Sequence, residues 1–215
     1  MPGIGADYGC GNLRVRLDFR RAMMSSFLAR RLEVLSDTIF GVAMTMPIYS
    51  LPLLDRQVGE GDWHAAVRVM LQPIFVFGCS FLFSGIFWFS HHRRLSLTNA
   101  NSRRYLFVTF SFLFLIVLLP VPTLLYSHDG TIPWIAALYS GYFAVVAAIN
   151  EGLWLATISS MPTRPWRLVI GPGILALVFA IATMVSLISP LASAITWLAV
   201  ILAPLADARA TKSPL

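Results

Sequence analysis

The sequence predicts an all-α integral membrane protein with six transmembrane helices per chain. Hydrophobic residues make up 57% of the 215 residues and charged residues only 12%, about half the charged fraction of a soluble domain. The mean hydropathy is +0.74. Apolar runs of about 20 residues recur along the chain, and each is long enough to cross the ~30 Å hydrocarbon core of a bilayer. Segments of ~10 residues with alternating polarity, which would indicate a barrel, are not seen.

The six spans are expected over residues 32–54, 65–90, 105–126, 134–159, 168–188 and 191–205. Pro47 and Pro52 are expected to kink or end the first span, and Pro120 and Pro122 to interrupt the third, because proline lacks the N–H that a helix interior needs. The predicted organisation is a mobile cytosolic tail over residues 1–29, a membrane domain over 30–206 and a short cytosolic tail over 207–215.

The positive charges predict the orientation of the chain. The formal net charge is +6, and Lys212 is the only lysine. Basic residues concentrate before the first span, between the second and third, between the fourth and fifth, and after the sixth. The positive-inside rule then places both termini in the cytoplasm of a multi-pass inner (plasma) membrane protein. In a membrane protein, this excess of positive charge indicates the orientation of the chain in the membrane, and no nucleic-acid partner is predicted.

The first span carries the chain's most unusual feature, Ser36-Asp37 shortly after a basic flank. A carboxylate at membrane depth is costly, and such residues usually face a protein interior and have a partner. The nearest basic candidates are Arg31 and the cluster at 91–94, which is expected at the same level at the end of the second span. Two interpretations remain open here: an ion or proton site, and a polar clamp between helices.

Helical geometry separates Ser36 and Asp37 from a second face of the same span. At about 100° per residue, four side chains fall within a stripe about 60° wide. The stripe consists of Thr38, Val42, Thr45 and Tyr49, with Met46 at its edge. From the residues alone, this stripe either contacts lipid and neighbouring helices or faces a pathway.

The remaining polar residues give weaker signals. His91 and His92 are adjacent, so they point in different directions on a helix and make a poor metal site; a hydrogen-bonding or pH-sensing role fits them better. Asn150 and Glu151 are either a buried polar pair or an interfacial one. The sequence has no phosphate-binding glycine loop, no nucleophile elbow and no HExxH motif. We therefore predict neither enzyme activity nor a cofactor.

Three stretches in order resemble a known family. Arg31-x-x-x-Leu35-Ser36-Asp37 resembles the RxxxFSD signature that opens the first helix of the transmembrane protein 175 family, the endolysosomal potassium channels and their bacterial relatives. The stretch 87–93 (FWFSHHR) looks like the WxxHH end of that family's second span. The stretch 99–123 begins with Asn99, ends in LPVPT, and looks like its third span. The resemblance covers about residues 30–125.

The resemblance implies a potassium-selective channel that lacks the usual TVGYG filter and assembles as a homotetramer around four first helices. The family's constriction lies five positions past the aspartate, which is Val42 here. Further rings would come from Thr45, Met46 and Tyr49, with Thr38 on the same face. The motif residues Arg31, Leu35, Ser36 and Asp37 would pack against the group Trp88, His91, His92 and Asn99 to support the pore helix. The implied partners are potassium ions, membrane lipid and three further copies, with no metal beyond permeating potassium.

Some residues depart from the family pattern. Leu35 replaces the motif phenylalanine, and Thr38 stands where glycine or alanine is frequent. Val42 is smaller than the usual leucine or isoleucine, so a wider and less selective ring is expected. The alternative function is a proton-coupled membrane transporter that uses Asp37, Glu151 and the neighbouring histidines. An intramembrane enzyme is disfavoured because no nucleophile and base pair is apparent.

Overall fold

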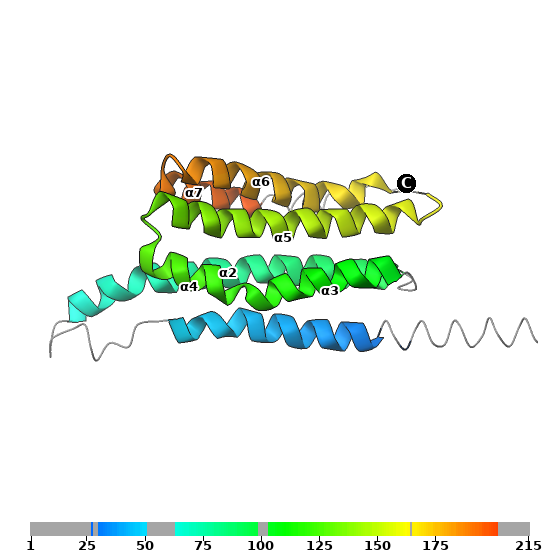
Figure 1. Ribbon diagram of the computed structural model, residues 1–215, viewed down its shortest axis with the longest axis horizontal. Helices are drawn as coiled ribbons and strands as arrows, with labels where there is room; N and C mark the ends of the chain where they lie inside the picture. Colours follow the sequence, from blue (N-terminus) through cyan, green and yellow to red (C-terminus); the bar gives the residue numbers. More distant parts are fainter. Residues whose placement is uncertain (1–26, 28–29, 51–62, 99–102, 164, 202–215) are drawn as a thin grey trace, which may run out of the picture.

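The computed structural model describes residue 27 and residues 30–50, 63–98, 103–163 and 165–201. Every regular element in these ranges is helical. The helices run alongside one another, with the first helix at one edge of the bundle and α5 to α7 on the opposite side (Figure 1). Most of the predicted N-terminal tail and all of the predicted C-terminal tail lie outside the described residues.

The first helix covers residues 30–45 and passes directly into η1 (Met46–Ser50). The tightening to a 3₁₀ turn begins one residue before Pro47. This position agrees with the expectation that proline, which cannot donate to a helical carbonyl, would disturb the second half of the span.

Helix α2 (Trp63–Leu97) is longer than the sequence predicted. The predicted span ended at Ser90, with His91 to Arg94 closing it, whereas the helix continues through these residues to Leu97. The extension is possible because His91 and Arg94 are buried and hydrogen-bonded within the protein. The four polar residues expected to close the span therefore lie inside the helix, which continues to Leu97.

The third apolar run is split at Leu119 into α3 (Arg103–Leu118) and α4 (Pro120–Asp129). Pro120 has no N–H for the carbonyl one turn back, and Leu119 instead donates a 3.2 Å bond to Ile116 O. The predicted interruption by Pro120 is therefore present. Helix α4 ends at Gly130, where an added Cβ would lie only 2.5 Å from Tyr126 O, so a larger residue cannot occupy this turn without a shift in the backbone.

The second half of the chain consists of α5 (Pro133–Ser159), η3 (Trp166–Val169), α6 (Ile170–Ser186), α7 (Pro190–Thr196) and η4 (Trp197–Ile201). Helices α5 and α6 form the most extensive helix pair in the described chain. Ser189 caps α7 by accepting a hydrogen bond from Ala192 N, a common role for serine at a helix start.

Four helices in the described ranges are long and apolar enough to cross a membrane, as judged by length and composition. They cover Val67–Leu97, Arg103–Asp129, Pro133–Ser159 and Trp166–Ser186. The first helix and the shorter apolar helix Pro190–Val200 occupy the positions of the predicted first and sixth spans. The membrane-helix class is thus confirmed, and the count of six crossings stays a prediction.

An aromatic cluster forms the centre of the bundle. Phe83 on α2 packs edge-on against Phe143 of α5 and Phe179 of α6, with ring centroids 5.1 and 5.0 Å apart. Trp197 closes the cluster from η4, 5.0 Å from the ring of Tyr139. These rings hold α2, α5, α6 and η4 together, and the first helix joins the same core through Phe40, whose ring centroid lies 6.1 Å from that of Phe112.

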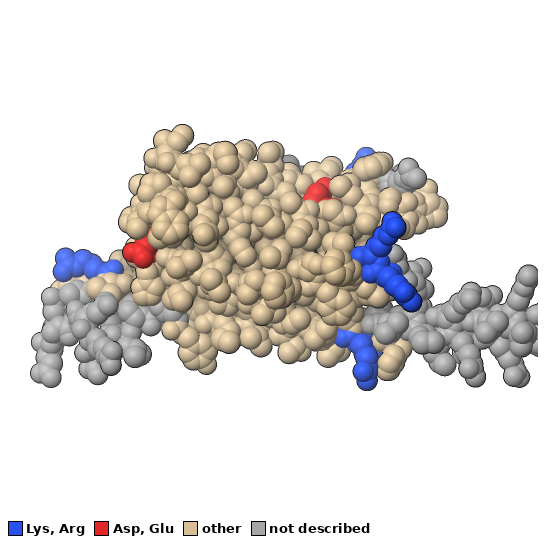
Figure 2. All heavy atoms as spheres, in the orientation of Figure 1, with Lys and Arg blue, Asp and Glu red and all other residues tan. Residues whose placement is uncertain are grey.

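The space-filling view separates charged ends from an uncharged middle. Arginine side chains gather mainly at one end of the bundle, where α3 begins and α5 ends, and the broad band between the two ends carries almost no charge on the face shown (Figure 2). Such a band is the surface expected of a protein embedded in hydrocarbon.

Candidate pore helix and its supports

The first helix buries one face and leaves the opposite face bare. The buried stripe comprises Leu32, Ser36, Phe40, Ala43 and Pro47. Their spacing of three or four residues places them on one side of the helix. Phe40 is 1% exposed and contacts the rings of His91 on α2 and Phe112 on α3. One side of the helix is therefore fixed against the bundle.

The stripe predicted to line a pore lies on the opposite, exposed side. Val42 is 50% exposed, Met46 48% and Tyr49 85%. Thr38 and Thr45 are exposed as well. A large apolar surface on a helix that is packed on its other side is available for lipid or for another subunit.

Two threonines put oxygen atoms on this bare face. Thr38 Oγ1 donates to Val34 O at 2.9 Å, and Thr45 Oγ1 lies 3.0 Å from Gly41 O and 3.1 Å from Val42 O. Each hydroxyl proton is thus used inside its own helix. The hydroxyl oxygen keeps its acceptor lone pairs, so the exposed face offers oxygens suited to a cation.

The structure brings Asp37 together with Trp88. Asp37 Oδ1 accepts a hydrogen bond from Trp88 Nε1 at 2.8 Å. Asp37 itself is exposed, whereas the neighbouring Ser36 is buried and donates to Glu33 O at 2.8 Å. Of the two residues expected to form a polar clamp, Ser36 therefore bonds only within its own helix, and Asp37 bonds to α2.

A second contact lies one turn away on both helices. His92 Nδ1 is 3.5 Å from Glu33 Oε1, and the rings of Trp88 and His92 stack with centroids 5.6 Å apart. Residues four apart share a helix face. The Glu33–His92 and Asp37–Trp88 contacts therefore lie one above the other between the two helices. Both contacts join the exposed edge of the first helix to α2.

Other predicted motif residues lie elsewhere. The Arg31 guanidinium lies over the Phe27 ring, 4.9 Å from its centroid, and not beside Asp37. Leu35 is 42% exposed. Asn99 lies outside the described residues. His91 is buried, and its ring lies against Phe40 of the first helix and Phe112 of α3.

A buried polar network that the sequence reading missed surrounds Arg94. This arginine has no exposed surface. Its Nη1 donates to Asn150 Oδ1 at 2.7 Å, its Nη2 lies 2.7 Å from His91 Nδ1, and its Nε donates to Tyr105 Oη at 3.2 Å. Since a guanidinium has only donors, His91 Nδ1 must be the acceptor in this contact, which places the ring proton on Nε2.

The same network continues to a second pair of residues. Trp154 Nε1 donates to Ser90 Oγ at 2.8 Å, and Asn150 Nδ2 donates to the same oxygen at 3.1 Å. Ser90 and Arg94 are four residues apart on α2, and Asn150 and Trp154 are four apart on α5. This matched spacing is the signal that sequence analysis could have used. The network joins α2 to α5 and, through Tyr105, to the start of α3.

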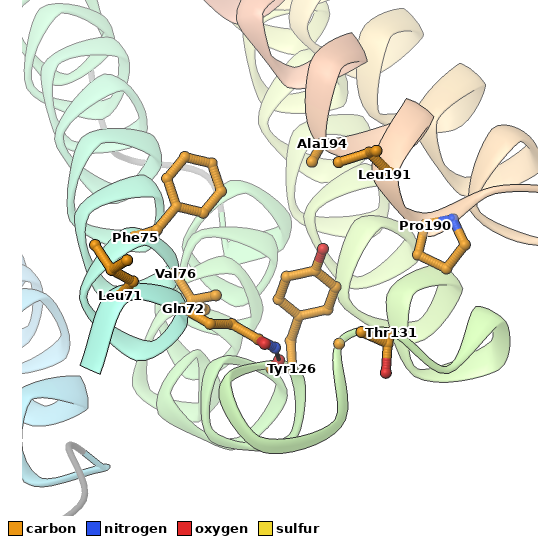
Figure 3. A pocket seen from close by; sticks show the side chains of 10 residues that line it. Leu71, Gln72, Phe75, Val76, Tyr126, Thr131, Pro190, Leu191 and Ala194 are labelled. Carbon is orange, nitrogen blue, oxygen red and sulfur yellow. Dashed lines mark hydrogen bonds between the residues drawn. The ribbon is translucent and has the colours of Figure 1, made fainter. Parts of the chain in front are cut away.

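A groove at the opposite end of the bundle has a different character. It has a volume of about 410 Å³ and lies between residues 71–76 of α2, the end of α4 and the start of α7. Phe75, Leu191 and Ala194 line it, and the Tyr126 ring stands between them (Figure 3). Gln72 at its edge donates to Tyr126 O at 3.3 Å. This mostly hydrocarbon surface suits an apolar chain rather than an ion.

The geometry defines an integral membrane helix bundle whose first helix packs against the bundle with one face and exposes the other. Comparison with known proteins then identifies the family it resembles. Residues 31–120 match the family model described as the endosomal/lysosomal potassium channel TMEM175. The resemblance that the motifs suggested is therefore confirmed for this part of the chain.

Named relatives and a solved structure agree with this match. Over 128 residues, the chain is 27% identical to a potassium channel of Streptomyces collinus and 26% identical to a potassium channel of Chamaesiphon minutus. These alignments cover 58% of this chain and 62% and 63% of the two relatives, so less than two thirds of either relative is spanned.

The fold is similar to the crystal structure of a lysosomal potassium-selective channel TMEM175 homolog from Chamaesiphon minutus. The TM-score is 0.71 at 22% identity, and the likeness covers 85% of this chain and 97% of the solved chain. It extends beyond the matched sequence into the second half of the chain. At this identity the likeness establishes the fold, which the two chains share.

Proposed function

We propose that this protein is a potassium-preferring cation channel without a TVGYG filter, which selects and gates through hydrophobic rings on its first helix. The observation that carries the proposal is the bare face of that helix, with Val42 half exposed and both threonine hydroxyls on the same side. The relatives named as potassium channels support the choice of potassium as the permeating ion. One helix cannot enclose a path, so the proposal includes a homotetramer in which four copies of the face meet.

The proposed mechanism is partial dehydration at a narrow apolar ring. A hydrophobic constriction closes by losing its water and, when open, makes an ion shed part of its hydration shell. Potassium has a lower charge density than sodium and gives up this water at lower cost. Thr45, one turn beyond Val42, presents hydroxyl oxygens that replace some of the lost ligands. Met46 and Tyr49 continue the path, and Thr38 lies one turn before the ring.

The supporting contacts have a defined task in this proposal. The contacts Glu33–His92 and Asp37–Trp88 hold the first helix at one rotation against α2. A turn of the helix by one residue would replace Val42 at the constriction with a neighbour. Asp37 is thus a positioning residue beside the path, and permeating potassium is the only metal required. The arginine-rich end faces the cytoplasm, with both termini there and lipid around the bundle.

The test is a liposome flux assay that compares potassium with sodium. Val42→Ala is expected to raise total flux and lower the potassium-to-sodium ratio several-fold, because the ring widens and less water is removed from the ion. Val42→Leu is expected to act in the opposite direction. Val117→Ala is the matched control, since Val117 on α3 is 51% exposed and Val42 is 50% exposed. If Val42→Ala behaves like the control, the pore assignment is wrong.

The same assay separates a channel from a proton-coupled transporter. A channel conducts down the potassium gradient without a pH gradient and keeps measurable flux in Asp37→Asn, whose side-chain oxygen can still accept from Trp88. A transporter that protonates Asp37 would lose coupled flux in this variant. Flux that requires a proton gradient and disappears in Asp37→Asn would favour the transporter.

A further inference from the structure

A second groove lies at the arginine-rich end of the bundle, away from the bare face of the first helix. It has a volume of about 270 Å³ and is formed by the start of α3, the last turns of α5 and the end of α2. Its lining changes in character along its length: Val108, Leu153 and Ala156 are apolar, while Arg104 and Thr157 are polar. A ligand that fits both parts must itself be amphipathic.

The polar part of the groove carries positive charge. Arg104 is exposed, and no described residue forms a hydrogen bond or ion pair with its guanidinium. Tyr105, which also lines the groove, accepts a hydrogen bond from the buried Arg94. The three side chains bonded to Arg94 are those of Asn150, His91 and Tyr105, and none of them is a carboxylate. A second positive charge therefore lies one hydrogen bond behind the groove wall, in a medium of low dielectric that strengthens its field.

The apolar part of the groove is open because one residue on its wall has no side chain. A Cβ built at Gly152 meets no other atom within 4 Å, so this position borders empty space. Gly152 is exposed and lies beside the buried Leu153. Any larger residue at 152 would project into this space and reduce it.

We propose that this groove binds one anionic phospholipid, with the phosphate on Arg104 and the first part of an acyl chain along Val108, Leu153 and Ala156. The groove lies where membrane-length helices reach the basic end of the bundle. Lipid supplies an anion and a hydrocarbon chain joined together at that level. Basic pockets between membrane helices are suited to anionic headgroups for the same reason.

The test is native mass spectrometry of the full chain in a neutral detergent, titrated with phosphatidylglycerol, phosphatidylcholine or inorganic phosphate. Phosphatidylglycerol is expected to bind more tightly than phosphatidylcholine. Arg104→Ala should weaken phosphatidylglycerol binding about fivefold, the loss expected for one basic contact at a membrane surface. Arg103→Ala is the matched control, because Arg103 is the exposed neighbour on α3 but does not line the groove.

A second variant tests the groove rather than the charge. Gly152→Leu should fill the apolar part and weaken the binding of both phospholipids. Gly78→Leu is its control, since Gly78 on α2 also has nothing within 4 Å of an added Cβ but lies outside this groove. Elution volume and helical circular dichroism verify that every variant folds, so a loss of binding is not a loss of structure.

Three results would overturn the proposal. Equal weakening by Arg103→Ala and Arg104→Ala would mean diffuse attraction to the basic end. Displacement of phosphatidylglycerol by inorganic phosphate at similar concentration would mean a free-anion site without a lipid requirement. Unchanged phospholipid binding in Gly152→Leu would exclude the groove. None of these measurements requires ion conduction, so they are independent of the channel assay.

Discussion

Asp37 and Arg94 are ionisable residues on neighbouring helices, and the structure treats them in opposite ways. Asp37 is exposed, and Trp88 gives it one hydrogen bond across to α2. Arg94 has no exposed surface and contacts the side chains of Asn150, His91 and Tyr105. The aspartate stands out in the sequence, and the arginine looks like one member of a basic cluster. The comparison shows that a charged residue that stands out in the sequence is not necessarily the one that is buried in the structure.

The two environments imply different energetics. A buried charge is tolerated only when its hydrogen-bonding groups are satisfied, because it has lost its water. Arg94 meets this condition with three side-chain partners and the Phe112 ring, 5.6 Å from the guanidinium carbon. Asp37 is exposed, so loss of its hydrogen bond to Trp88 leaves no buried polar group without a partner. Substitutions at the two sites should therefore differ in size.

The largest effect is expected for Arg94→Ala. It leaves His91 Nδ1 buried without a donor, leaves Asn150 Oδ1 with only the 3.4 Å hydrogen bond from Ser90 Oγ, and opens a space between α2, α3 and α5. We expect the free energy of unfolding to fall by about 3 kcal/mol, measured by SDS titration of the protein in mixed micelles. Arg103→Ala is the control, because Arg103 is exposed. A loss below about 1 kcal/mol would place Arg94 with the surface arginines and remove the contrast with Asp37.

An intermediate effect is expected for Asn150→Leu, which removes the acceptor for Arg94 and the donor to Ser90. The expected loss is about 2 kcal/mol, because Arg94 keeps its contacts with His91 and Tyr105. Asn150→Asp sharpens the test: it retains an acceptor for Arg94 and adds an opposite charge, so it should lose less than Asn150→Leu. The same SDS titration measures both. Equal losses in the two variants would show that side-chain shape, and not the bond to Arg94, makes Asn150 important.

The sequence predicts the helices well because their causes are local. Apolar runs of membrane length mark α2 to α6, and the proline at 120 marks the break between α3 and α4. The bare stripe of the first helix also follows from local geometry, since helical spacing alone separates Val42 and Thr45 from Ser36. Residue spacing within one segment was sufficient for these features.

The buried network could not be predicted in the same way. Arg94 is buried only because Asn150, 56 residues away, and Tyr105 supply partners in space. Without those contacts, a run of two histidines and two arginines is more easily read as the end of a span, and the predicted end at Ser90 followed from that reading. Similarly, spacing could not choose between Trp88 and a basic residue as the partner of Asp37, because the choice depends on how two helices are rotated against each other.

The smallest effect is expected at the Asp37–Trp88 contact, where a double-mutant cycle isolates the pair. Asp37→Ala, Trp88→Phe and the double variant should give a coupling energy of about 0.6 kcal/mol, the average for side-chain hydrogen bonds between membrane helices. The cycle is needed because Trp88→Phe also changes stacking on His92, which the double variant subtracts. The Arg94 and Asn150 pair, measured by the same titration with Arg94→Ala and Asn150→Leu, should give a larger coupling. If the Asp37–Trp88 coupling equals or exceeds it, the exposed carboxylate holds the first helix as strongly as the buried arginine holds α2 against α5.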